Sequence, residues 1–201
     1  MATLDAFSRV ITHHTITIDT QYRTQKIDDS IRSNCVCPVP TMRELASKIV
    51  RCKAMMHSYE KGDLVLTLQD VIFLSNRADK KPSHLGLLIN AVDKNGSTTV
   101  LKNINTDVRT EISPKHEEGE GYEVSSHMII SLDGNMRTYD MSFMPIPGVS
   151  TAKINGFLNK VLFNVAKDNE DIFSCNTLTN EVSSLTKKKI KVLYLSLIHI
   201  S

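Results

Sequence analysis

An alternation of apolar and polar residues between residues 122 and 143 constrains the fold more than any other stretch of the chain. The apolar set on its first arm is Tyr122, Val124, Met128, Ile130 and Leu132. This period of two is typical of a strand with one buried face. Asp133, Gly134 and Asn135 interrupt it, and a two-residue Gly-Asn loop favours a tight hairpin with glycine at positive φ. The pattern therefore predicts an antiparallel hairpin.

The hairpin loop also predicts a register. If Asp133 pairs with Met136, then Met128 lies opposite Met141 and both strands direct their apolar residues to one face. The other face then places His127 opposite Ser142, with Asp140 diagonal to the histidine. A slip of one residue would mix the two faces, so the alternation supports this pairing.

Two helices are predicted. Thr41 and Glu44 have the spacing of a capping box, in which each side chain accepts a hydrogen bond from a backbone donor at the helix start. An apolar stripe at spacings of four and three follows it and predicts a helix over residues 41–61. The second helix, over residues 151–167, begins after Ser150 or Thr151, either of which can cap it.

Further strands are predicted around the hairpin. Residues 9–19 are rich in Thr, Ile and Val, and residues 63–74 form a nearly continuous apolar run that indicates a central strand covered on both faces. Residues 85–93 and 98–104, joined by Asn95 and Gly96, predict a second hairpin. The fold class is α+β, with a mostly antiparallel sheet and two amphipathic helices packed on it.

The chain of 201 residues is expected to form one domain. Residues 168–201 are the exception within it. They contain a polar stretch followed by an apolar run over residues 190–200, which is either a sheet strand or the mark of a sequence cut short or frameshifted. The segment is therefore predicted either to complete the domain or to be an appendage.

Composition excludes several classes of protein. A net charge of +2 indicates no strongly charged partner, and the chain has neither an apolar leader after Met1 nor a run near the roughly 20 residues of a membrane span. With four cysteines this predicts a cytoplasmic protein without a membrane partner. Cys35 and Cys37 lack the C-x-x-C spacing of zinc sites, so no metal is expected, and no motif indicates another cofactor.

Several short motifs resemble those of uncharacterised bacterial proteins found in prophages and defence islands. They lie between residues 60 and 165 and include residues 93–95, 106–109, 118–121, 126–130 and 147–150. The resemblance implies a prokaryotic or phage setting and a role in antiviral defence. It supplies no catalytic residues.

Two sets of residues are candidates for function. His127, Asp140 and Ser142 would supply a base, its orienting carboxylate and a hydroxyl nucleophile on one strand face, although such residues are also common on solvated faces. Lys187, Lys188 and Lys189 form a basic cluster that could meet phosphates. The sequence thus predicts a defence or prophage component that binds nucleic acid or a protein partner, and the alternative is a metal-independent hydrolase or nuclease using His127. The oligomeric state stays open.

Overall fold

A computed structural model describes residues 9–22, 39–75, 80–96, 99–135, 137–178 and 189–200. Within these residues, eight strands form one sheet in the order β2-β3-β4-β7-β8-β1-β10-β9, and each neighbouring pair is antiparallel. The strands are β1 (Thr12–Tyr22), β2 (Met56–Tyr59), β3 (Leu64–Ser75), β4 (Pro82–Asp93), β7 (Tyr122–Ser131), β8 (Thr138–Phe143), β9 (Ser174–Leu178) and β10 (Lys189–Ile200). The helices are α2 (Met42–Ile49), α3 (Thr151–Asp168) and α4 (Glu170–Phe173), with 3-10 turns at Val50–Cys52, Glu60–Gly62 and His116–Glu118.

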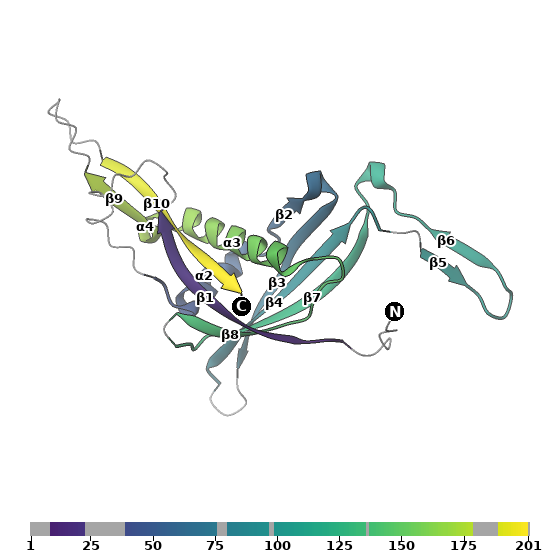
Figure 1. The fold of residues 1–201 in the computed structure, drawn as a ribbon, viewed down its shortest axis with the longest axis horizontal. Helices are drawn as coiled ribbons and strands as arrows, with labels where there is room; N and C mark the ends of the chain where they lie inside the picture. Colours follow the sequence, from purple (N-terminus) through teal and green to yellow (C-terminus); the bar gives the residue numbers. More distant parts are fainter. Residues whose placement is uncertain are drawn as a thin grey trace.

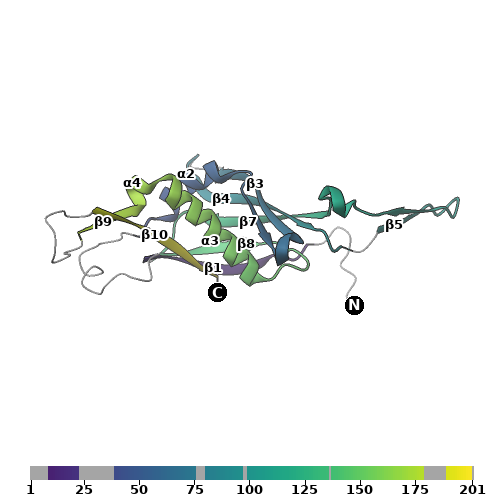
Figure 2. The same ribbon diagram turned by 90° about the horizontal axis from the view of Figure 1, so that it is seen from above.

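One face of the sheet carries the core. The sheet curves around α3, and α2 packs beside it on the same side (Figures 1 and 2). The strands contribute Ile16, Leu66, Ile89 and Met128, and α3 contributes Phe157, all of them fully buried. This face is called the inner face below, and the opposite one the outer face. The predicted α+β fold with two helices on a mostly antiparallel sheet is confirmed.

The start of the first helix is confirmed, but its predicted length is wrong. Thr41 and Glu44 form the capping box, with the Thr41 backbone N–H donating to the Glu44 carboxylate at 2.8 Å. The helix ends at Ile49 instead of residue 61. Ala54 N–H donates to the Leu68 carbonyl at 2.8 Å, so the chain here joins the sheet and continues as the edge strand β2. Pairing with β3 therefore replaces the predicted last turns of the helix.

Helix α3 agrees with its prediction. Ser150 is the N-cap, and its hydroxyl accepts a hydrogen bond from the Lys153 backbone N–H at 3.3 Å. The buried side of the helix contains the predicted apolar stripe from Ile154 to Val165. Tyr59 at the end of β2 donates its hydroxyl to the Lys153 carbonyl at 2.8 Å. This bond fixes the first turn of α3 to the sheet.

Two predictions about the strands are wrong. Strand β3 is neither central nor covered on both faces, because it lies second from the sheet edge and Ile72 on its outer side is half exposed. Residues 98–104 do not return along β4, since β3 and β7 occupy both of its edges. Instead β5 (Thr99–Lys102) pairs with β6 (Arg109–Ile112) in a separate two-stranded ribbon. This ribbon projects from one end of the sheet (Figure 1).

The β7–β8 hairpin forms with a register two residues away from the predicted one. Met128 lies opposite Phe143, and Ile130 lies opposite Met141. A shift of two preserves the assignment of faces, so Met128 and Met141 are both buried as expected. They are diagonal neighbours instead of opposite partners. The predicted pairing of His127 with Ser142 is therefore wrong.

The hairpin loop explains this shift. Asn135 and Thr138 exchange two backbone hydrogen bonds of 3.0 and 2.9 Å, so the chain turns after Asn135 and not at Gly134. Gly134 is absent from the residues with positive φ. A Cβ there would instead lie 2.3 Å from the Thr138 carbonyl oxygen and 2.4 Å from the Tyr139 ring. Glycine is required at this position because the Thr138 carbonyl and the Tyr139 ring approach its Cα closely. The sequence pattern does not distinguish this reason from a turn with positive φ.

The remaining predictions concern the chain ends. The strand predicted over residues 9–19 is confirmed as β1, and the apolar run 190–200 is part of β10, which pairs with β1. Lys187 and Lys188 lie outside the described residues, as does Ser201. Lys189 is the first residue of β10, where it pairs with Leu178 of β9.

Candidate functional site

The three residues of the predicted catalytic set lie on the outer face but do not meet. Ile129 is the partner of Ser142, and the same register places Asp140 beside Ser131. His127 is thus four positions from Asp140, about 13 Å along the strands at 3.3 Å per residue. That separation excludes a hydrogen bond between the imidazole and this carboxylate. The face assignment is correct, but the predicted His–Asp contact is wrong.

Ser142 contacts a different histidine. His13 of β1 lies opposite it, and His13 Nδ1 is 3.0 Å from the Ser142 hydroxyl. Asp140 lies opposite Thr15, the next outer-face position along β1. Both His13 and Asp140 are exposed, and no ion pair between them is found within the described part of the chain. A histidine and a serine in this solvated setting, without a bonded carboxylate, lack the orienting group of a catalytic triad.

A shallow apolar groove surrounds His127 on the outer face, and it has a volume of about 390 Å³. Ile72 is 50% exposed and Ile129 39% exposed. The groove exists because Gly86 between them has no side chain: a Cβ there would come within 2.9 Å of Ile72 Cγ1. The lining comprises Asp70, Ile72, Leu74, Gly86, Leu87, Leu88, His127, Met128 and Ile129.

Asp70 provides the one carboxylate of the groove lining. Lys53 Nζ lies 2.8 Å from its Oδ1, and this hydrogen bond, together with one from the Val71 backbone, lowers the pKa of Asp70. The carboxylate is therefore ionised and already paired with a cation. Its ion pair with Lys53 leaves the groove with mainly apolar contact surface around His127.

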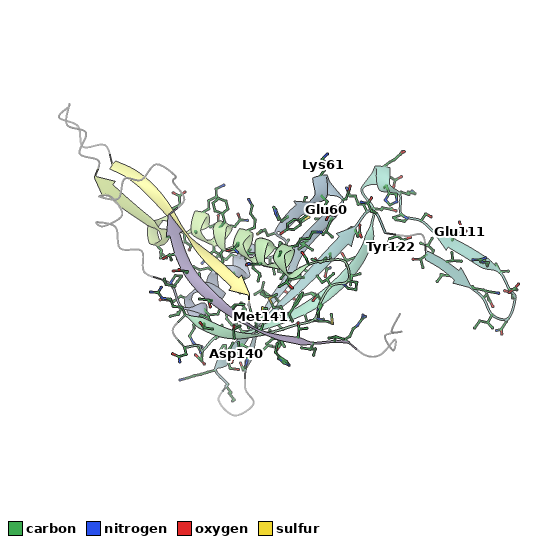
Figure 3. The ribbon with its side chains drawn as sticks, in the orientation of Figure 1. Glu60, Lys61, Glu111, Tyr122, Asp140 and Met141 are labelled. Carbon is green, nitrogen blue, oxygen red and sulfur yellow. The ribbon has the colours of Figure 1, made fainter. Side chains whose placement is uncertain are left out.

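The β5–β6 ribbon, residues 99–112, is called the arm below. Its base is fixed by Tyr122 at the start of β7 (Figure 3). The Tyr122 hydroxyl donates to the Ile112 carbonyl at 2.7 Å and accepts from the Thr99 backbone N–H at 3.1 Å. Its ring also occupies the space above Gly96, where a Cβ would lie 2.4 Å from Tyr122 Cδ2. One side chain thus holds both strands of the arm.

A pocket of about 310 Å³ lies below the arm and is called the arm-base pocket. It opens between the end of the sheet and the segment that leads into α3. Its apolar lining includes Leu64, Ala91, Val124 and Ile146. Glu60, Asp93, Tyr122 and Lys153 supply its polar groups. Apolar walls with a few polar groups are the usual composition of a small-molecule site.

A turn in an uncommon backbone conformation borders this pocket. Glu60, Lys61 and Gly62 have φ values of 51°, 58° and 105°. Residues other than glycine rarely adopt such values, and they are retained where surrounding contacts stabilise them. Lys153 supplies that contact, because its ammonium forms an ion pair with the Glu60 carboxylate, and both residues line the pocket. The turn and the first turn of α3 are thereby connected.

No group of three or more His, Cys, Asp and Glu side chains with the arrangement of a metal site occurs within the described residues. In the same part of the chain, no helix has the length and apolarity needed to cross a bilayer.

Comparison with protein-family models, with curated proteins and with solved structures gives no match. The resemblance to prophage and defence-island proteins therefore stays a prediction.

Sequence reasoning located the outer face but missed the arm and the pocket. The arm was missed because Asn95 and Gly96 were interpreted as a hairpin turn, whereas they lead the chain out of the sheet. No clear local signal marked the arm, because neither residues 99–102 nor residues 109–112 show the strict apolar–polar alternation of a strand with one buried face. The pocket could not be predicted, because its residues come from four separate stretches of the chain, within residues 60–64, 91–99, 122–124 and 146–153.

Proposed function

We propose that this chain is a non-catalytic binding protein that uses the arm to contact a protein partner. The observation that carries this proposal is an uncovered apolar face on the arm. Leu101, Val108 and Ile112 are 54%, 58% and 46% exposed. Thr99 pairs with Ile112 and Leu101 with Thr110, so these residues share one side of the ribbon.

The pairing continues to the tip of the arm. The Asn103 backbone N–H donates to the Val108 carbonyl at 2.9 Å, which places Val108 on the same side as Leu101. Val100, Lys102, Arg109 and Glu111 occupy the other side. The arm is thus amphipathic, with an apolar face that packs on nothing in the described part of the chain.

The marginal stability of an isolated ribbon and its fixed base both favour a partner for this face. A two-stranded ribbon is at best marginally stable in water, and contiguous exposed apolar residues usually mark an interaction surface. Tyr122 holds the arm away from the sheet, so the apolar face is presented to solvent in a fixed direction. A fixed element loses less conformational freedom on binding than a flexible one.

Charge on the arm favours protein over nucleic acid. Residues 99–112 contain two basic side chains, Lys102 and Arg109, and two acidic ones, Asp107 and Glu111. Lys102 is already paired with Asp107. A surface without excess positive charge gains little from the release of counterions that drives binding to phosphate backbones. The predicted place in a prophage or defence system belongs to this proposal as its biological setting.

Site-specific photocrosslinking tests the proposal. The photoreactive residue p-benzoylphenylalanine is placed at Leu101, on the apolar face, or at its neighbour Val100, on the opposite face, and the protein is irradiated in its host cells. A protein adduct of defined mass is expected from position 101 and not from position 100. Equal adducts at both positions, or none at position 101, would contradict a partner on this face.

A further inference from the structure

The arm-base pocket contains polar groups that the proposed contact of the arm does not use. Glu60 and Lys153 form an ion pair with each other, so their charges compensate. Asp93 accepts a hydrogen bond from the Asn95 backbone N–H at 2.9 Å, and no cationic side chain pairs with it within the described residues. The charge left over in the lining is therefore one negative carboxylate at the pocket rim.

The floor of the pocket is apolar and constrained. Leu64 and Ala91 come from adjacent strands of the inner face, Val124 from the next strand, and Ile146 from the segment before α3. A volume of 310 Å³ lies at the lower end of the range for ligand pockets, which suits a single ring or a short alkyl chain. The uncommon turn at Glu60 and Lys61 maintains one wall by its ion pair with α3. Such conformations cluster at ligand sites.

We propose that the arm-base pocket binds a small primary amine with a short apolar body. The ammonium group lies against the Asp93 carboxylate, and the apolar body contacts Leu64, Ala91, Val124 and Ile146. This site goes beyond the proposed contact of the arm with a protein partner and does not depend on it. Tyr122 also lines the pocket, and its hydroxyl, which donates to Ile112 and accepts from Thr99, retains one lone pair for a further hydrogen bond.

Titrations of the full chain with three matched probes, followed by NMR, test this proposal. 2-Phenylethylamine is the cationic probe, 2-phenylethanol its neutral counterpart, and 3-phenylpropionate its anionic one. The amine is expected to shift the backbone signals of Ala91 and Val124 in a saturable manner. It should bind about fivefold more tightly than the alcohol, the upper range for a solvent-accessible ion pair, and the carboxylate most weakly.

Two variants provide the controls. Asp93→Asn should weaken amine binding about fivefold and leave alcohol binding unchanged, because only the charge is removed. Asp63→Asn removes a nearby carboxylate that does not line the pocket, so it should change neither affinity. Both substitutions are isosteric and lie near strand ends, where the fold tolerates them. The proposal would be overturned by an absence of saturable shifts, by carboxylate binding as tight as amine binding, or by equal effects of the two variants.

Discussion

At Gly134 the chain needs a residue without a side chain, because the Thr138 carbonyl and the Tyr139 ring occupy the space of a Cβ. Tyr139 in turn accepts a hydrogen bond from the Met42 backbone N–H at 3.0 Å, one of the donors at the start of α2 that has no partner within the helix. A glycine in the hairpin loop thus permits the ring position that connects β8 to the first helix. The sequence pattern identified the glycine, but the reason it is needed depends on a residue five positions away.

Met128 and His127 are adjacent in β7 but lie on opposite faces of the sheet. Met128 is fully buried against the helices, whereas His127 is exposed in the outer groove. We expect Met128→Ala to lower the free energy of unfolding by about 2 to 5 kcal/mol, through lost apolar contact and the resulting cavity. His127→Ala should cost under about 0.5 kcal/mol. Urea unfolding of both variants measures this difference, and the reverse order would contradict the assignment of faces.

Cys52 should be unreactive in the folded protein. Burial, with a smaller contribution from Asp168, raises the pKa of its thiol from 9.0 to about 11, so the nucleophilic thiolate is scarce at neutral pH. Iodoacetamide at pH 8 followed by peptide mass analysis should leave Cys52 unmodified until urea unfolds the chain. Rapid modification of Cys52 in the native protein would show that the thiol is accessible.

The same pKa sets a direction for stability with pH. The unfolded chain releases the Cys52 proton near pH 9, whereas the folded chain retains it until about pH 11. The contribution of this thiol is therefore complete below pH 9 and lost as the pH rises toward 11. Relative to Cys52→Val, which cannot ionise, the unmodified protein should lose stability across this interval. A constant difference in urea midpoint would contradict the raised pKa.

At the scale of elements, local signals predicted where helices begin better than where they end. The capping box and the Ser150 cap depend on residues three positions apart, so the sequence alone identifies them. The end of α2 depends on the edge of β3. After residue 53 the backbone forms hydrogen bonds with β3 instead of continuing the helix, and residues so distant in sequence are not visible in a local pattern. The helical spacing of apolar residues continues past that point through Met56 and Tyr59. These two residues lie in strand β2, so the spacing alone did not mark the end of the helix.

The capping box gives a test at this scale. Thr41→Ala should lower the free energy of unfolding by about 1 kcal/mol, because the Glu44 backbone N–H loses its acceptor. Glu44→Gln is the matched variant, since a glutamine oxygen can still accept from the Thr41 backbone N–H. It should cost clearly less. Thermal unfolding followed by circular dichroism compares the two, and equal losses would indicate that charge matters more than the hydrogen bond.

For the whole molecule, the fold class was predictable and the functional surfaces were not. Alternation along strands and stripes on helices are local properties, and they sufficed for the layers of the α+β fold. The outer face was also predictable, because an even shift in register leaves every side chain on its own face. The predicted contact between His127 and Asp140 is wrong because it depended on the strand register, and the predicted register differs from the observed one by two residues.

The nucleic-acid prediction still has its own test at this scale. If Lys187, Lys188 and Lys189 meet phosphates, changing all three to glutamine should flatten the slope of log affinity against log salt by roughly 2 to 3 units. The loss should be nearly independent of base sequence. Titrations with duplex DNA, single-stranded DNA and RNA at several salt concentrations measure it. An absence of binding at low salt would exclude this role.

The two hydrogen bonds of Tyr122 have a consequence for the kinetics of the proposed contact between the arm and a protein partner. An arm anchored at its base samples few orientations. A partner would therefore bind only when it meets the arm in the correct orientation. Loss of the hydroxyl, as in Tyr122→Phe, would free both strands and let the arm sample many directions. A mobile arm would meet partners in more orientations. It would also lose more conformational entropy on binding, so each complex would be weaker and dissociate sooner. In the proposed contact, the tyrosine would therefore favour long-lived complexes in one geometry.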